Sequence, residues 1–327
     1  MGKLAFVYPG QGCQAPGMGK DLYEHYEVAR QVFDQASDAL GIDMAELCFA
    51  GSMEELSLTE NTQPAILTVS VAMTEILKSH GILPSAVAGL SLGEYSALVA
   101  SNALDLEEAV SLVRTRGLLM QNEVPSGQGG LLAVVGLSSE KIEAAIAPLR
   151  EHGTISCSNF NATDQTVVGG ELVLLDEAQA LLKEAGARMT KLLNVSAPFH
   201  TNMLEGAGKK LRPYLEEAKI LRPFADYYPN TIGEKVNFDA LAPEVAESKT
   251  PIIDLLEQQV SNPVRWVQSV KAMVEDGVDT FVEVYPGKTV ASLIKKIDKT
   301  VKVISLASLE DLEAFIAEYK GEDEWAV

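Results

Sequence analysis

Ser91 is the third residue of the sequence GLSLG (89–93), which has the GxSxG pattern of a nucleophilic serine. A short apolar stretch at 85–90 predicts a buried strand before it, and a helix is predicted to begin at Leu92. A tight turn between strand and helix lifts the serine hydroxyl above the sheet, and the first N–H groups of the helix point at the reacting oxygen. We therefore predict a serine nucleophile, with the Leu92 N–H group as a donor to an oxyanion.

The chain offers four histidines as the base that such a serine needs. His25 lies in a polar helical stretch, His80 ends a helix before a glycine, and His152 lies in a predicted loop. His200 differs, because it follows the apolar, proline-containing segment 196–199, where two domains are expected to meet. A neutral imidazole can take the serine proton and return it, so we predict that His200 is the base. A buried histidine with only a structural role is the alternative.

Arg116 lies on the apolar face of a helix predicted over about 105–122. The apolar residues of this face recur at three- and four-residue spacing, and they are Ala109, Leu112, Val113 and Met120. A buried arginine needs an anionic partner, and a substrate carboxylate can supply one through a planar two-point contact. An internal ion pair with an acidic residue, or a side chain that reaches solvent, would explain the same pattern.

The composition excludes several classes of protein. The 327 residues carry a formal net charge of −20, which disfavours nucleic acid and anionic membranes as partners. No apolar stretch approaches the roughly 20 residues of a membrane span. The three cysteines are widely spaced and predict neither disulfides nor a zinc site. We expect no metal and a reducing, cytoplasmic location.

Strands and helices alternate in the first 124 residues. A strand at 4–8 ends at the sequence PGQG (9–12), and helices are predicted at 21–40 and 62–80. Pro64 is expected in the first turn of the second helix, where proline is tolerated. Asp105 and Glu108 are expected to form a capping box at the start of the helix that carries Arg116. The order predicts an α/β fold with a parallel sheet.

The middle of the chain predicts a second, smaller domain. The glycine-rich stretch 125–130 indicates a linker. Elements in the order β-α-β-β-α-β follow it up to about residue 194, which is the ferredoxin-like pattern. We therefore predict a large catalytic domain over 1–124 and 195–327, with a small domain at 125–194 inserted in it.

The motifs resemble those of a known family, the malonyl-CoA:acyl carrier protein transacylases of fatty-acid synthesis and the acyltransferase domains of polyketide synthases. The likeness covers nearly the whole chain, and the shared motifs occur in the same order. They are YPGQG (8–12), GLSLGE (89–94), RGLLMQ (116–121), APFH (197–200), QVSNPVRW (259–266) and PGKT (286–289). The resemblance implies an α/β-hydrolase-like large domain with an inserted ferredoxin-like domain.

The resemblance also implies a role for individual residues. The Gln11 N–H group would join that of Leu92 in the oxyanion hole. Arg116 would grip the malonyl carboxylate. The backbone carbonyl of Gln259 would orient His200, which gives a Ser-His dyad without a buried acid.

Four further positions bear on the pocket. Phe199 resembles the malonyl-selective members of the family, and its bulk should crowd a substrate with an α-methyl group. Met120, one turn along the helix from Arg116, is expected to line the same pocket. Leu90 stands where the family usually has histidine, which should alter the polarity of the pocket or helix packing. Tyr285 replaces a commoner glycine.

The implied reaction moves malonyl from coenzyme A to an acyl carrier protein through a malonyl-serine, without a cofactor. Lys288, Lys295 and Lys296 form one candidate basic cluster for these anionic partners, although lysines solvated on a helix are as good an explanation. A monomer is the default expectation. The alternatives are a free-standing polyketide-type acyltransferase, an acyl-thioester hydrolase on the same fold, an ordinary α/β-hydrolase esterase, and a non-catalytic module that docks carrier protein.

Overall fold

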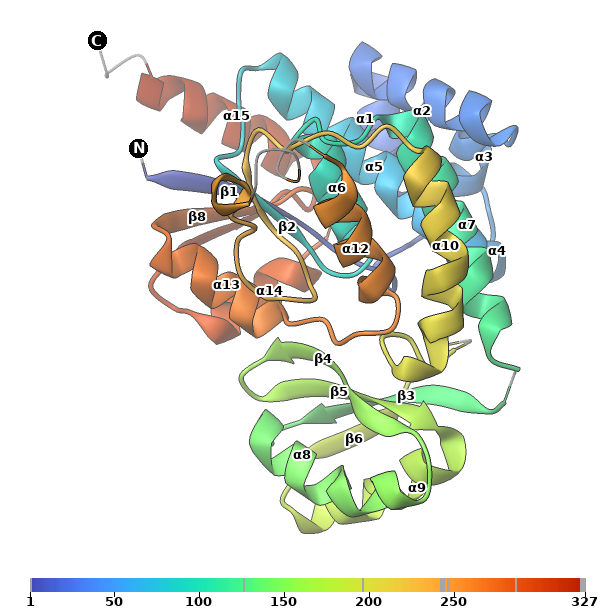
Figure 1. Ribbon diagram of the computed structural model, residues 1–327. Coiled ribbons are helices and arrows are strands. Elements are labelled where there is room, and N and C mark those ends of the chain that lie inside the picture. Colours follow the sequence, from blue (N-terminus) through green and yellow to red (C-terminus); the bar gives the residue numbers. More distant parts are fainter. Residues whose placement is uncertain are drawn as a thin grey trace.

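Two separate sheets organise the chain (Figure 1). The structure is a computed structural model that describes residues 2–125, 127–195, 197–241, 245, 248–285 and 287–323. Ser126, Ser196 and Pro286, which belong to the predicted linker and motifs, lie outside the described residues. The α/β fold class with an antiparallel second unit is confirmed.

The larger sheet has five parallel strands. Their spatial order is β7 (Asp226–Tyr228), β2 (Ala86–Gly89), β1 (Lys3–Tyr8), β8 (Val278–Glu283) and β9 (Lys302–Ser305). Successive side chains of a strand point to opposite faces, and both faces of the central strand β1 are covered. A strand buried on both faces needs no polar alternation, which explains the continuous apolar runs in the sequence.

Helices cover both faces of this sheet. On one face, α13 (Trp266–Glu275) and α14 (Thr289–Ile297) pack on Ala5 and Val7 of β1. Leu4, Phe6 and Tyr8 point to the other face and into the main core. The helices of that part of the chain are α1 (Lys20–His25), α2 (Glu27–Leu40), α3 (Met44–Phe49), α4 (Met53–Ser57), α5 (Thr59–Ser79), α6 (Gly93–Ala100) and α7 (Leu106–Glu123).

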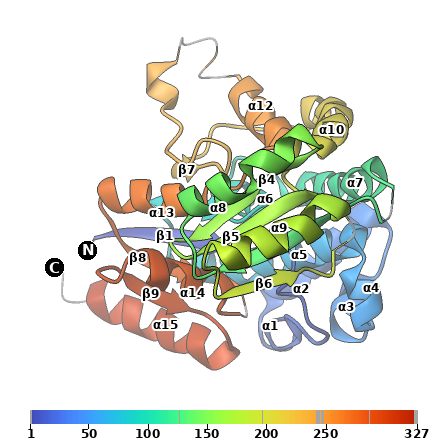
Figure 2. The ribbon, with the colours of Figure 1, turned by 90° about the horizontal axis from the view of Figure 1, so that it is seen from below.

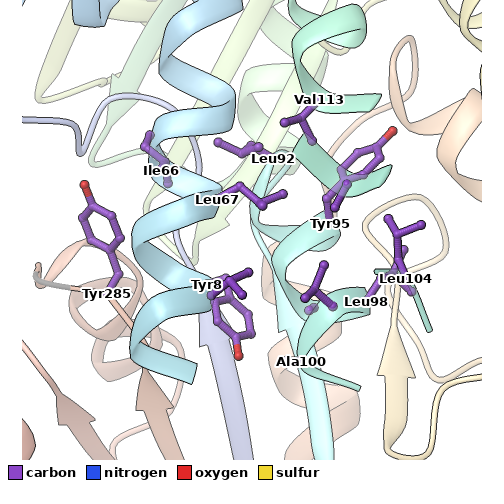
Figure 3. Close-up of a cluster of buried hydrophobic side chains, with 14 of the residues drawn as sticks. Tyr8, Ile66, Leu67, Leu92, Tyr95, Leu98, Ala100, Leu104, Val113 and Tyr285 are labelled. Carbon is purple, nitrogen blue, oxygen red and sulfur yellow. The ribbon is translucent and has the colours of Figure 1, made fainter. Parts of the chain in front are cut away.

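Side chains of the main core pack the turn that carries Ser91 against the long helix α5. Figure 3 shows Leu67 of α5 together with Leu92 and Tyr95 of the α6 region, and all three belong to one buried cluster. None of the three side chains has measurable exposure to solvent. The turn that carries Ser91 is therefore supported by packed side chains on its far side.

The second sheet is antiparallel and forms the small unit. Its strands stand in the order β4 (Ile155–Ala162), β5 (Gln165–Glu171), β3 (Gly129–Val135) and β6 (Met189–Leu192). Helices α8 (Ser139–Ile146) and α9 (Leu172–Glu184) cover one face of it (Figure 2). This is the ferredoxin-like arrangement that the sequence predicts.

Backbone hydrogen bonds join the two units. The Phe160 N–H group of β4 donates to the Val264 carbonyl at 2.8 Å, and the Val264 N–H group donates to the Ser158 carbonyl at 2.9 Å. The segment just before α13 therefore extends the edge of the small sheet. The limits of 125–194 for a separate domain stay a prediction.

Three local predictions are wrong. The single helix predicted over 21–40 is two helices, α1 and α2, because the backbone of Tyr26 between them is extended. Helix α5 begins at Thr59, so Pro64 lies inside the helix and not in its first turn. Asp105 is the N-cap of α7 but makes no side-chain capping bond, and Glu108 accepts the Lys219 N–H group instead. A tertiary contact has replaced the local one.

The last part of the chain contains elements that the periodicity did not indicate. These are strand β7 and helix α12 (Thr250–Gln259), which both end beside the site described below. Two further helices are α10 (Glu205–Glu217) and α15 (Leu309–Asp323). Within the described ranges, no helix combines the length and the apolar character that a membrane span requires.

Candidate active site

Ser91 lies two residues after the end of β2, at the carboxyl edge of the parallel sheet. Its φ is 56°, in the left-handed region that a side chain rarely adopts. The flanking glycines permit this turn. A Cβ atom on Gly89 would lie 1.9 Å from the carbonyl carbon of Gly93, and one on Gly93 would lie 2.4 Å from the Tyr8 carbonyl oxygen. Only glycine fits at both positions, so the turn needs the motif that the sequence shows.

The structure brings His200 to the serine. The His200 Nε2 atom lies 2.7 Å from Ser91 Oγ, and the Nδ1 atom lies 2.7 Å from the Gln259 carbonyl oxygen. A carbonyl oxygen can only accept, so Nδ1 carries the proton. Nε2 is then free to accept the serine proton, as a base must.

Helix α12 explains why the Gln259 carbonyl is available. Gln259 is the last residue of that helix, and the last carbonyl groups of a helix have no partner within it. The negative end of the helix also favours positive charge on the imidazole as it takes a proton. No carboxylate is bonded to His200 among the described residues.

Arg116 is buried, with 1% of its surface exposed, and it reaches the same serine. Its Nη2 atom donates to Ser91 Oγ at 3.0 Å and to Gln259 Oε1 at 2.8 Å, and its Nη1 atom donates to Gln63 Oε1 at 2.7 Å. In the part of the chain that the structure describes, Arg116 forms no ion pair, and its buried Nε atom has no partner. The predicted internal ion pair is absent from this region, so the cation is held by neutral acceptors.

The electrostatic surroundings keep His200 neutral. Burial, and secondly the nearby Arg116 cation, lower the pKa of His200 from its usual value to about 3. Burial likewise lowers the pKa of Arg116. His200 is therefore neutral over the whole physiological range, and its Nε2 lone pair is not already occupied by a proton.

Two backbone N–H groups lie near the serine without a partner. Gln11 follows β1 in the loop 9–12, and this loop packs on the turn so closely that a Cβ atom on Gly10 would lie 2.5 Å from the Leu90 carbonyl oxygen. Gln11 and Leu92 border the same cavity. Among the described residues, neither of their N–H groups donates a hydrogen bond. Both donors are therefore free to bind a developing oxyanion.

A cavity of about 250 Å³ opens above the serine, between the two units. The large unit and the small unit both contribute to its wall, including Met120 and Phe199 as the sequence predicted. The residues that line it are Gln11, Gly12, Gln14, Ser57, Gln63, Leu90, Ser91, Leu92, Arg116, Met120, Leu131, Asn159, Asn161, Val167, Leu193, Asn194, Val195, Phe199 and His200.

Sequence reasoning missed several polar residues of the site. Gln63 of α5 holds Arg116, and Asn159 and Asn161 of β4 face the cavity. Glu94 and Asn230 lie behind the serine turn. Glu94 had a signal, since it ends the motif GLSLGE, whereas the others stand in no recognisable pattern.

The structure places the two residues that were expected to depart from the family pattern, Leu90 and Tyr285. Leu90 lines the cavity beside the serine, so it makes this part of the wall apolar. Tyr285 is buried, and its hydroxyl donates to the Cys13 carbonyl at 3.3 Å, just beyond the loop that carries Gln11.

The predicted basic cluster is divided. Lys288 stands at the start of the nine-residue helix α14, and Lys295 and Lys296 stand in its last turn. The ends of such a helix are about 13 Å apart. None of the three lysines lines the cavity above Ser91. Among the described residues, no group of three or more His, Cys, Asp or Glu side chains could hold a metal ion.

Comparison with known proteins finds relatives that match nearly the whole chain. Residues 5–313 match the family described as the acyl transferase domain. The chain is 38% identical to the malonyl CoA-acyl carrier protein transacylase of Bacillus subtilis over 325 residues, which cover 99% of both chains. The crystal structure of the transacylase from Clostridium perfringens has a TM-score of 0.92 at 39% identity and 99% coverage of both chains. A malonyl-transacylase in complex with its type II polyketide acyl-carrier protein has a TM-score of 0.91 at 35% identity, covering 97% of this chain and 99% of that chain.

Proposed function

The chain belongs to the acyl transferase family, and on that premise we propose that it moves a malonyl group from coenzyme A to acyl carrier protein through an ester on Ser91. This activity belongs to fatty-acid synthesis. One observation carries the residue assignment. Ser91 Oγ is bonded both to a neutral imidazole and to a buried guanidinium that has no anionic partner among the described residues.

The first half of the reaction acylates the serine. His200 Nε2 takes the proton of Ser91 as Oγ attacks the carbonyl carbon of the malonyl thioester. The N–H groups of Gln11 and Leu92 stabilise the tetrahedral oxyanion. The carbon–sulfur bond then breaks, and the coenzyme A sulfur leaves with the proton from His200.

The second half returns the serine. The phosphopantetheine thiol of the carrier protein gives its proton to His200 and attacks the malonyl ester. The ester bond to Ser91 breaks, and Oγ regains a proton from His200. Atoms and charges balance without a redox cofactor.

Arg116 selects the acyl group. A malonyl carboxylate gives the guanidinium the anionic partner that a buried cation requires, in a charge-assisted contact. In the free protein one Arg116 donor is bonded to Ser91 Oγ, and the carboxylate competes for it. An acetyl group has no such charge and leaves the buried cation unpaired.

Intact mass measurement tests the proposal. The protein is incubated with malonyl-CoA alone, and a malonyl adduct is expected on the wild type and not on Ser91→Ala. Release of free malonate without an adduct would favour a thioester hydrolase and contradict the transfer. A monomeric state and a cytoplasmic location stay predictions from the sequence.

A further inference from the structure

Glu94 is a buried carboxylate one turn beyond the nucleophile, on α6, with no exposed surface. Three donors meet it. They are the Tyr227 hydroxyl, the Asn230 N–H group at 3.0 Å and the Gln259 Nε2 atom at 2.8 Å. Glu94 does not line the cavity, so a substrate bound there would not contact it.

Two of these three residues also hold the backbone of Ser91 through their side chains. The Asn230 side chain accepts the Ser91 N–H group at 2.6 Å and donates to the Gly89 carbonyl at 2.6 Å. The Gln259 Nε2 atom donates to the Ser91 carbonyl at 2.9 Å. Both backbone groups of Ser91, whose φ is left-handed, are thus held by side chains of two residues that are hydrogen-bonded to Glu94. Gln259 reaches Glu94 through its side chain, and Asn230 reaches it through its backbone N–H group.

The same carboxylate helps to set the orientation of the Gln259 amide, together with the Ser91 carbonyl. Carboxylate oxygens accept, so the Gln259 NH₂ group must face Glu94, and its Oε1 atom must face the other way. That oxygen accepts from Arg116 Nη2 at 2.8 Å. With the amide reversed, Gln259 would present a donor to the guanidinium, which has no acceptor.

We propose that Glu94 is a positioning residue for the transfer reaction, which anchors Asn230 and Gln259 and through them sets both the Ser91 turn and the direction of Arg116. This proposal rests on the proposed function. It differs from a purely structural role in one respect. Loss of the carboxyl group should change which acyl group is preferred, because the Gln259 NH₂ group then keeps only the Ser91 carbonyl as an acceptor, and the direction of Oε1 toward Arg116 is held less firmly.

The decisive variant is Glu94→Gln, which keeps the shape of the side chain and removes its charge. Rapid-quench mass measurement gives the acylation rate with malonyl-CoA and with acetyl-CoA. We expect malonyl transfer to Ser91 to slow on the order of 10- to 100-fold, as for reacting groups displaced by about 1 Å. The malonyl-to-acetyl rate ratio should fall as well.

Glu283→Gln is the matched control. Glu283 is also a buried carboxylate, and it accepts N–H groups of Val290 and Ala291 at the start of α14, away from the cavity. This variant should lose thermal stability and keep both the rate per active site and the malonyl-to-acetyl ratio. If Glu94→Gln behaves in the same way, Glu94 is only structural and the proposal is wrong.

Two further measurements cover the remaining outcomes. If Glu94→Gln does not fold, Tyr227→Phe removes one donor to Glu94 and keeps the ring. The acylation rate with malonyl-CoA and the malonyl-to-acetyl rate ratio should then both fall, by less than in Glu94→Gln. An unchanged ratio in that variant overturns the proposal. Labelling of Ser91 by the neutral reagent phenylmethanesulfonyl fluoride should also slow about 10-fold in Glu94→Gln. If the wild type takes no malonyl group but labelling still slows in Glu94→Gln, the proposed function is refuted and the positioning role of Glu94 stands.

Discussion

Ser91 and His200 meet across a 2.7 Å hydrogen bond, and both have left-handed backbone, with φ of 56° and 60°. Only Asn102 shares this property among the described residues other than glycine. Such a conformation costs free energy and persists where the surrounding contacts hold it. The conformations of both residues of the proposed proton exchange therefore depend on the packing around them.

The strain at Ser91 predicts a difference between two inactive variants. Ser91→Ala keeps a Cβ atom in the left-handed region, whereas Ser91→Gly removes the clash that this atom makes. We expect the glycine variant to have the larger free energy of unfolding, by roughly 1 kcal/mol. Urea unfolding of the two proteins measures this. Equal stability would mean that the turn carries no strain.

The low pKa of His200 predicts a wide pH range for acylation. With a pKa of about 3, the imidazole is neutral at every ordinary pH, so the acylation rate should be flat between about pH 5 and pH 8. An unperturbed histidine would lose activity below about pH 6.5. In Arg116→Ala the repulsion by the cation is gone, so the acidic limb should move to higher pH.

The same pKa predicts how stability depends on pH. The unfolded imidazole has a pKa of about 6.5 and the folded one a lower value, so the unfolded chain binds the extra proton. The contribution to stability is complete above pH 6.5 and is lost as pH falls toward 3. Between pH 7 and pH 5 the free energy of unfolding should drop by about 2 kcal/mol from this group. Urea unfolding of His200→Gln should show a correspondingly smaller drop.

Arg116→Ala should change the preferred acyl group. Without the guanidinium, a malonyl carboxylate would be buried unpaired, so malonyl transfer should fall and the ratio of acetyl to malonyl transfer should rise. Arg114→Ala is the matched control, since Arg114 lies on the same helix and does not line the cavity. Unchanged malonyl selectivity in Arg116→Ala would remove this residue from the site.

The sequence was most informative where chemistry depends on neighbours in the chain. Gly89 and Gly93 flank Ser91 because the turn leaves no space for a Cβ atom, and this requirement is visible as a motif. His200 could be selected because only four histidines exist. Arg116 could be placed on a buried face because a helix has a fixed period.

The polar residues behind the site could not be predicted in this way. Asn230 contacts Ser91 across 139 positions, and Gln63 contacts Arg116 across 53 positions. No spacing rule links residues on different helices and strands. The failed capping box of Asp105 has the same cause, since Glu108 turns to the Lys219 N–H group and away from its own helix. Tertiary contacts decide such cases.

Phe199 should limit the size of the acyl group. Its side chain is 9% exposed and lines the cavity next to His200, where a methyl group on the α-carbon of the substrate would need space. In Phe199→Ala, the ratio of methylmalonyl to malonyl transfer should rise on the order of 10-fold, the usual effect of space for one methyl group. The variant should also lose roughly 3 kcal/mol of stability, so the rates are measured at low temperature. Phe224→Ala, at a half-exposed position outside the cavity, should leave the ratio unchanged. An unaltered ratio in Phe199→Ala would show that other residues of the wall exclude the α-methyl group.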